Sequence, residues 1–279
     1  QTLCYKYEIE RNLRTRDYAG FQLLGLNDYS GQGTALVGPL NVHWREKGYV
    51  TAEEWRQFCN VVVPLARFPR FVYTNRDTLD VPVEVYNAYK MMIAQIRTSY
   101  YIINDTGQVV TGAMLSQGDL PAGKNVNVGT VKVPLNTISA PTKLTLVVQL
   151  SGKIKNQWDF WVYPAHDYND GAGGLSSDAH NVYIADSLDQ TALGVLDGGG
   201  SVLLTAAGHV TLGSDVRQTY LPVFWNTSGF KMRPPHTTGA YIDSQHPLFR
   251  HGFPTDDWAN LNWWELLNRA QVMNLMEFP

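Results

Sequence analysis

The sequence predicts a multidomain protein in which two segments that mix helices and strands flank a central all-β domain. With 279 residues the chain is too long for one ordinary domain and suits two or three of about 80 to 150 residues. Apolar residues recur at helical spacing near the N-terminus. Their period changes to two between residues 79 and 164, and a strand-helix-strand pattern follows after residue 182.

Composition narrows the possible partners. The net charge is -3, from 22 basic and 25 acidic residues, and no run of Lys or Arg offers a surface for a phosphate backbone, so nucleic acid is not expected. No stretch reaches the ~20 apolar residues of a membrane span. The N-terminus has no secretion-signal pattern, and we expect any such signal to be removed or to lie upstream. Cys4 and Cys59 form no C-x-x-C motif, and no cofactor is expected.

The first segment, residues 1–75, has the predicted order helix, buried strand, polar loop, helix. Residues 3–16 carry apolar side chains at i, i+4 and i+8, which is typical of an amphipathic helix. The apolar run at residues 21–26 predicts a parallel strand covered on both faces. A capping pattern at residues 51–54 begins a second helix that runs to about Asn60.

The middle segment, residues 76–166, alternates with the period of a strand. Leu144, Leu146, Val148 and Leu150 are separated by single residues, and residues 104–107 form a hairpin turn between two strands. Gly129 marks a bulge at which the alternation changes phase. Six or seven short strands in ~85 residues predict an immunoglobulin-like β-sandwich.

The last segment, residues 175–279, follows a glycine-rich linker at residues 167–177. It begins with a buried strand at residues 182–185 and a helix capped by Ser187 and Gln190. Three glycines at residues 198–200 end that helix, and a second strand follows at 202–204. This βαβ unit predicts an α/β domain with a parallel sheet, and a packed helix is expected within residues 258–276.

Three possible sites in this last segment do not withstand inspection. The glycines follow the helix instead of preceding it, so they are not a phosphate loop. The domain is similar to class I glutamine amidotransferases, but no cysteine occurs after Cys59 and no G-x-S-x-G motif replaces it, so that activity is not expected. Spacings of ten and five residues between His236, His246 and His251, with Asp243 nearby, match no metal-ligand pattern and indicate local hydrogen bonds.

The polar loop after the first predicted strand is the best candidate site. Asn27, Asp28, Tyr29 and Gln32 supply a carboxylate, amides and an aromatic ring where a barrel strand would end, and such loops build the active sites of α/β barrels. The alternative is a turn in which Asn27 and Asp28 only satisfy backbone groups.

Several stretches along the chain carry a resemblance to bacterial family 2 glycoside hydrolases of the β-galactosidase type. They lie in all three segments: residues 7–15, 20–24, 28–38, 44–49, 58–66, 158–164, 222–226, 246–248 and 253–255. The resemblance implies that residues 1–75 are the last helix-strand-helix of a (β/α)8 barrel. It also implies an immunoglobulin-like domain at 76–166 and an amidotransferase-like, flavodoxin-like accessory domain at 175–279.

The resemblance implies a retaining glycosidase acting on an oligosaccharide or polysaccharide, with Asn27, Asp28, Tyr29 and Gln32 lining the sugar site. Both catalytic carboxylates would precede this chain, because the family places them at the ends of the fourth and seventh barrel strands. We therefore expect the fragment to be inactive, with the upstream part of its barrel as a partner. A homodimer and a periplasmic or secreted location are further expectations.

A second hypothesis comes from another class of protein. Exposed Trp225, Trp258 and Trp263 would serve as stacking platforms in a non-catalytic carbohydrate-binding or adhesion module. Calorimetry against a panel of oligosaccharides would distinguish the two hypotheses, because binding that survives deletion of residues 1–75 would favour this module.

Overall fold

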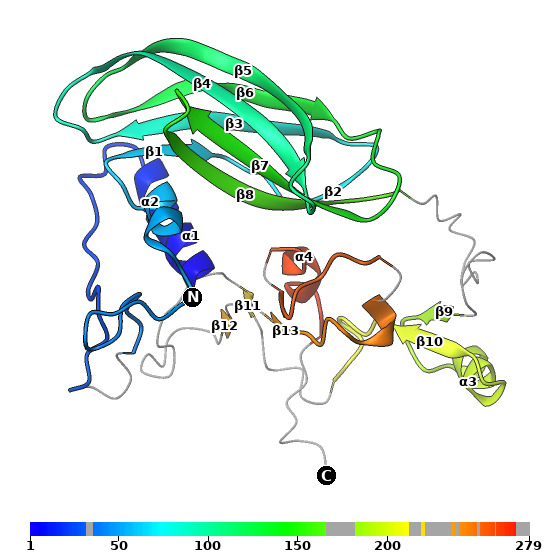
Figure 1. Ribbon diagram of the computed structural model, residues 1–279. Coiled ribbons are helices and arrows are strands. Elements are labelled where there is room, and N and C mark those ends of the chain that lie inside the picture. Colours follow the sequence, from blue (N-terminus) through cyan, green and yellow to red (C-terminus); the bar gives the residue numbers. More distant parts are fainter. Residues whose placement is uncertain are drawn as a thin grey trace. The chain divides into compact units, whose positions relative to one another are not determined.

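The computed structural model describes residues 1–31, 36–165, 182–211, 219–220, 236–237, 240–249, 252–259 and 261–271 (Figure 1). These residues fall into two compact units. The first unit contains Gln1–Pro164 and the described part of Thr238–Asn262. The second contains the described parts of Ala165–Leu221, Asn226–Thr237 and Trp263–Pro279. Strands in sheets dominate the described residues, and helices are few.

A two-sheet β-sandwich forms most of the first unit (Figure 1). One sheet has the strand order β1-β3-β6 and the other the order β2-β8-β7-β4-β5; all neighbours are antiparallel except β2 and β8. The bounds are β1 Val62–Ala66, β2 Val72–Thr74, β3 Thr78–Asn87, β4 Ile93–Asn104, β5 Val109–Leu120, β6 Lys124–Pro134, β7 Thr142–Leu150 and β8 Ile154–Tyr163.

The predicted alternation places one face of each sheet in a shared core. Leu144, Leu146, Val148 and Leu150 of β7 are all buried there, as expected for residues that project from the same face of a strand. The hairpin at residues 104–107 is confirmed, because it joins β4 to β5. Strands β1 and β2 precede residue 76, so the sandwich begins inside the segment that the sequence assigns to the barrel.

The predicted bulge at Gly129 is also confirmed. Val83 pairs with Gly129 whereas Glu84 pairs with Asn127, so the register of β3 against β6 shifts at this point. Gly129 has φ +125°, a conformation that residues with a side chain rarely adopt.

Both predicted N-terminal helices are present, and they cover the outer face of β1. Helix α1 spans Thr2–Arg14 and helix α2 spans Ala52–Phe58. The capping box of α2 forms between Thr51 and Glu54 as predicted. All of β1 is buried because its alternate residues enter two cores, one inside the sandwich and one under the helices; the latter consists of Ile9, Leu13, Phe58, Val63 and Leu65.

The prediction of a buried strand at residues 21–26 is wrong for this chain. The run is irregular, with isolated bridges at Asn27–Leu40 and Leu40–Glu46 as the nearest pairing, and the Leu24 side chain is fully exposed. An apolar run becomes a strand only when neighbouring strands satisfy its backbone groups and cover its side chains. No other strand of the described chain pairs with this run.

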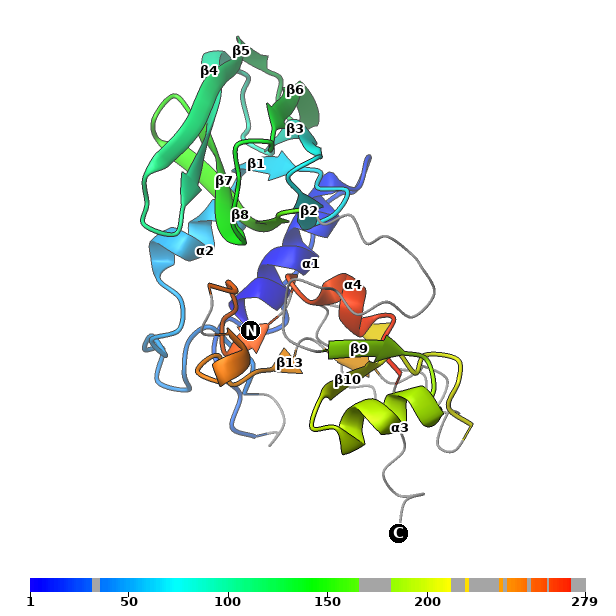
Figure 2. The same cartoon turned by 90° about the vertical axis from the view of Figure 1, so that its right-hand side faces the viewer.

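The βαβ unit of the second unit is confirmed (Figure 2). Strand β9, Val182–Ala185, pairs in parallel with β10, Ser201–Leu204, and α3, Gln190–Asp197, connects them. Two details differ from the prediction. Strand β9 is only partly covered, and Asp189 caps the helix instead of Ser187 because its carboxylate accepts from the Ala192 N–H at 2.8 Å.

Shorter elements complete the two units. In the first unit, β13 (Ala240–Tyr241) pairs antiparallel with β14 (Trp258–Ala259), and a 3-10 turn spans Pro247–Phe249. In the second unit, β11 (Thr219–Tyr220) pairs in parallel with β12 (His236–Thr237). A packed helix is expected within residues 258–276, and the described part of that range contains one helical turn, α4 Trp264–Leu267. The predicted linker at residues 167–177 lies outside the described residues.

Candidate functional site

Asp28 of the predicted sugar-binding loop is buried and already paired. Its Oδ1 accepts from the Gly38 N–H at 3.0 Å and forms an ion pair with the Lys47 Nζ at 3.0 Å. The same Lys47 also donates to the carbonyl oxygens of Leu36 and Gly38, at 3.3 and 3.1 Å. Asp28 therefore closes a loop of the chain in this structure.

The other predicted residues of the loop differ in whether their side chains are exposed and whether they form local hydrogen bonds. Asn27 donates from Nδ2 to the Asp28 carbonyl oxygen at 3.0 Å, so its amide is also used locally. The Tyr29 ring is exposed and lies against Gly31, where an added Cβ would lie 2.4 Å from the Tyr29 hydroxyl oxygen. Gln32 lies outside the described residues. Of the three described residues Tyr29 is exposed, Asn27 is partly buried and Asp28 is buried.

Two tyrosines attach this loop to its surroundings. The Tyr5 hydroxyl of α1 donates to the Val37 carbonyl oxygen at 2.5 Å, and the Tyr49 hydroxyl donates to that of Gly38 at 3.1 Å. Burial raises the pKa of Tyr49 to about 12, and the nearby Tyr5 and Asp28 add to the rise. Tyr49 therefore remains a hydrogen-bond donor at any physiological pH.

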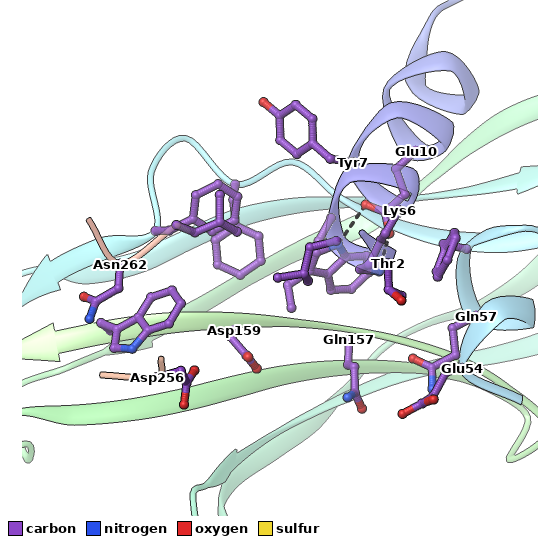
Figure 3. Close-up of a pocket in the computed structure, with 18 of the residues that line it drawn as sticks. Thr2, Lys6, Tyr7, Glu10, Glu54, Gln57, Gln157, Asp159, Asp256 and Asn262 are labelled. Atoms are coloured by element: carbon purple, nitrogen blue, oxygen red, sulfur yellow. Dashed lines mark hydrogen bonds and ion pairs between the residues drawn. The ribbon is translucent and has the colours of Figure 1, made fainter. Parts of the chain in front are cut away.

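A pocket of about 440 Å³ lies elsewhere in the first unit (Figure 3). Helix α1 forms one wall, α2 a second, strand β8 a third, and residues 254–256 with 261 and 262 a fourth. Gln157 and Asp159 project from β8, and Glu54 and Gln57 come from α2. Aromatic side chains also line the pocket: Tyr7, Tyr49, Phe58, Phe68, Phe71, Trp158 and Trp161.

A buried carboxylate, Glu10, occupies the inner wall of this pocket. It accepts from the Arg14 guanidinium at 2.6 Å, from the Trp158 indole N–H at 2.8 Å and from the Asn156 amide at 2.8 Å. The Lys6 ammonium donates to both Glu10 and Asn156. We call this cluster the Glu10 network. It joins α1 to β8, and both oxygens of the carboxylate already accept hydrogen bonds.

The two glutamates of the pocket are held in their ionised form. Burial raises the pKa of Glu10, but the charges of Lys6 and Arg14 and the hydrogen bonds from Lys6 and Trp158 outweigh it, so the pKa is lowered. Hydrogen bonds from the backbone N–H and hydroxyl of Thr51 lower the pKa of Glu54. Neither group is a proton donor near neutral pH.

The two aspartates of the pocket share one cation. Lys143 forms ion pairs with the Oδ2 atoms of Asp159, at 3.1 Å, and Asp256, at 3.3 Å. Burial lowers the pKa of Lys143, but the two carboxylates outweigh it and the pKa is raised. Lys143 also lies over the Trp161 ring, 5.9 Å from its centroid. The pocket's carboxylates are thus neutralised by cations or held in a helix cap.

Sequence reasoning assigned Glu10 to a helix but not to a buried cluster. A pattern was available, because Lys6, Glu10 and Arg14 follow each other at intervals of four and so share one face of α1. The partners Asn156 and Trp158 lie more than 140 residues away in the chain, and no local pattern connects them to α1.

The histidines and tryptophans considered as candidates from the sequence are described only in part. Nδ1 of His246 accepts from the Leu248 N–H at 3.2 Å, a local hydrogen bond of the predicted kind. The described residues contain no group of three potential metal ligands. Trp263 is half-buried in the second unit, while the side chains of Trp225 and Trp258 lie outside the described residues. No described helix is long and apolar enough to cross a membrane.

Two family models match separate parts of the chain. One, described as Domain of unknown function (DUF8488), matches residues 77–164, and the other, described as Domain of unknown function (DUF8487), matches residues 183–279. Neither description states an activity. No curated protein matches the chain.

Solved structures with partial similarity include glycoside hydrolases. A β-glucosidase from Listeria innocua in complex with glucose is 12% identical, with 37% of this chain and 16% of that chain covered and a TM-score of 0.29. A β-glucuronidase from glycoside hydrolase family 2 is 14% identical, with 38% and 11% covered and a TM-score of 0.25.

A protein with a different activity is similar to a comparable extent. The Pseudomonas fluorescens alkylpurine DNA glycosylase, bound to DNA containing an abasic site analog, is 14% identical, with 37% and 30% covered and a TM-score of 0.30. The match covers at most 30% of the length of each of these three structures. These partial similarities do not indicate a function for this chain.

Proposed function

We propose that this chain is the C-terminal part of a retaining glycoside hydrolase resembling family 2 β-galactosidases, and that it does not catalyse hydrolysis alone. The observation that carries the proposal is the exposed apolar run at residues 21–26. Its apolar pattern is typical of a strand covered on both faces, yet in this chain the run forms no strand, pairs with no strand of the described residues and leaves Leu24 fully exposed. Seven preceding barrel strands would supply the missing cover.

The chemistry of the pocket agrees with a chain that lacks the catalytic pair. A retaining glycosidase needs one carboxyl group with a raised pKa as acid and a second, ionised one as nucleophile about 5 Å away. Glu10 and Glu54 both have lowered pKa values, and Asp159 and Asp256 are both paired with Lys143. Neither glutamate therefore has the raised pKa of the acid, and both aspartates are engaged in ion pairs.

The proposal is tested by comparing this chain with a longer parent that contains the preceding barrel. Both would be assayed with chromogenic β-galactosides and β-glucosides. We expect turnover by the parent and none by the 279-residue chain. Robust turnover by the short chain, or no turnover by the parent, would contradict the proposal.

The role proposed for Asp28 is tested in the same parent. We expect Asp28→Ala to lower kcat/KM by about tenfold or more, because the carboxylate holds the loop that carries Asn27 and Tyr29 toward the sugar. Asp28→Asn is the matched control, since it keeps an acceptor for the Gly38 N–H and loses only the pairing with Lys47. We expect an intermediate loss for it. An unchanged kcat/KM in both variants would leave Asp28 a purely structural role.

A further inference from the structure

We infer that the pocket between α1, α2, β8 and residues 254–262 binds a neutral sugar, without catalysis. This goes beyond the proposed function, because it assigns to the present chain a ligand site whose lining residues do not include Asn27, Asp28 or Tyr29. The site consists of described residues of the first unit alone (Figure 3).

The dimensions of the pocket suit a small carbohydrate. At about 440 Å³ it lies in the range of sites for small ligands, and it is large enough for about one or two sugar rings. Trp161 and Phe71 contribute aromatic surface, and Phe71 is held by stacking on Phe68 at 5.3 Å between ring centroids. Aromatic faces that alternate with polar groups match a sugar ring, whose C–H groups are apolar and whose hydroxyls are polar.

The charges of the pocket favour a ligand without net charge. Lys6 and Arg14 are occupied by Glu10, and Lys143 lies between Asp159 and Asp256. An anionic ligand would meet carboxylates from β8, α2 and residue 256, and each cation among the described residues that line the pocket, Arg67 included, is already paired with a carboxylate. A cationic ligand would have to compete with ammonium and guanidinium groups that are already bonded.

Two glutamines supply the groups that recognise hydroxyls. Gln57 of α2 and Gln157 of β8 line the pocket, and no hydrogen bond is found for either side-chain amide among the described residues (Figure 3). Each amide offers two donor hydrogens and an acceptor oxygen. Gln157 is exposed on its strand, so its amide can bond to a ligand without losing an internal partner.

The experiment is calorimetry of the intact 279-residue chain with lactose, cellobiose, xylobiose and galactobiose. Gln157→Ala and Asp256→Ala remove exposed polar groups of the pocket and leave the core intact. The matched control is Gln117→Ala, an exposed glutamine of β5 outside the pocket. We expect binding of at least one disaccharide, weakened about tenfold by each pocket variant and unchanged by the control.

Three results would overturn the inference. The first is the absence of binding for all four disaccharides, and the second is binding that both pocket variants leave unchanged. The third is binding that Trp263→Ala abolishes while the pocket variants retain it, which would move the site to the second unit. These results are independent of the activity of a longer parent, so the inference and the proposed function can fail separately.

Discussion

Glu10 accepts hydrogen bonds from four side chains, two of them cationic, and through it α1 is joined to β8. A buried carboxylate is tolerated only when its charge and its lone pairs are matched, and the Glu10 network achieves both. Asp28 is a second buried carboxylate, paired with Lys47 and with a backbone N–H. Both buried carboxylates are thus engaged by ion pairs and hydrogen bonds within the first unit.

Replacing Glu10 by Gln is expected to destabilise the protein strongly. The substitution leaves Lys6 and Arg14 partly buried without an anion, and breaking a buried pair in this way costs about 3–5 kcal/mol. Chemical denaturation measures the free energy of unfolding. Glu8→Gln is the control, because Glu8 lies on the same helix, is more exposed and is 4.0 Å from Arg11. Equal effects of the two substitutions would contradict a special role for the Glu10 network.

The same carboxylate predicts a pH dependence. Because the folded protein lowers the pKa of Glu10 below its ordinary value of 4.5, its contribution to stability is complete above pH 4.5 and is lost as the pH falls through the folded pKa. The difference in unfolding free energy between the wild type and Glu10→Gln should therefore shrink as the pH is lowered from about 5 to about 3. A difference that stays constant over this range would show that the ionisation of Glu10 does not stabilise the fold.

At the scale of elements, the sequence correctly predicts those features that depend on interactions between nearby residues. The capping box of α2, the hairpin between β4 and β5 and the glycine stop after α3 all depend on residues within a few positions of each other. The run at residues 21–26 shows the opposite case, since its pattern predicts a strand and its surroundings in this chain provide no partner.

The bulge in β6 gives a test at this scale. Gly129→Ala is expected to cost on the order of 1–3 kcal/mol, because φ +125° is strained for any residue with a Cβ. Space is not the cause, since the new Cβ would meet Leu115 at an ordinary 3.6 Å. Thermal unfolding measures the effect, with Gly118→Ala in β5 as the control, where nothing lies within 4 Å. A similar melting temperature for both variants would exclude backbone strain at the bulge.

At the scale of the whole molecule, residues distant in sequence complete the first unit. Asp256 pairs with Lys143, and the Tyr163 hydroxyl donates to the Oδ1 of Asn262 at 2.6 Å. The Tyr163 ring stacks on Phe253 with centroids 5.5 Å apart. The sequence assigns residues 252–262 to the third segment by their position, whereas their contacts place them with the sandwich.

Truncation after Pro164 tests the stability of the sandwich separately from the contribution of the later residues to the pocket. The core of the sandwich lies within residues 62–162, so a chain of residues 1–164 should still unfold in one cooperative transition. It would lack the wall of the pocket that Asp256 and Asn262 form, and we expect it to lose sugar binding. Circular dichroism and calorimetry measure the two properties. Undiminished binding by the short chain would contradict the placement of residues 254–262 in the site.

The sequence by itself determined the helices at the N-terminus, the strand alternation and bulge of the sandwich and the βαβ order near residue 190. Each follows from the spacing of neighbouring residues, from the capping of α2 by Thr51 and from the backbone conformations that Gly adopts. Only the tertiary structure decided that Glu10 is buried against β8, that residues 254–262 complete a pocket and that the run at residues 21–26 is uncovered. Burial depends on which distant segments pack together, and the periodicity of one segment does not indicate which other segments cover it.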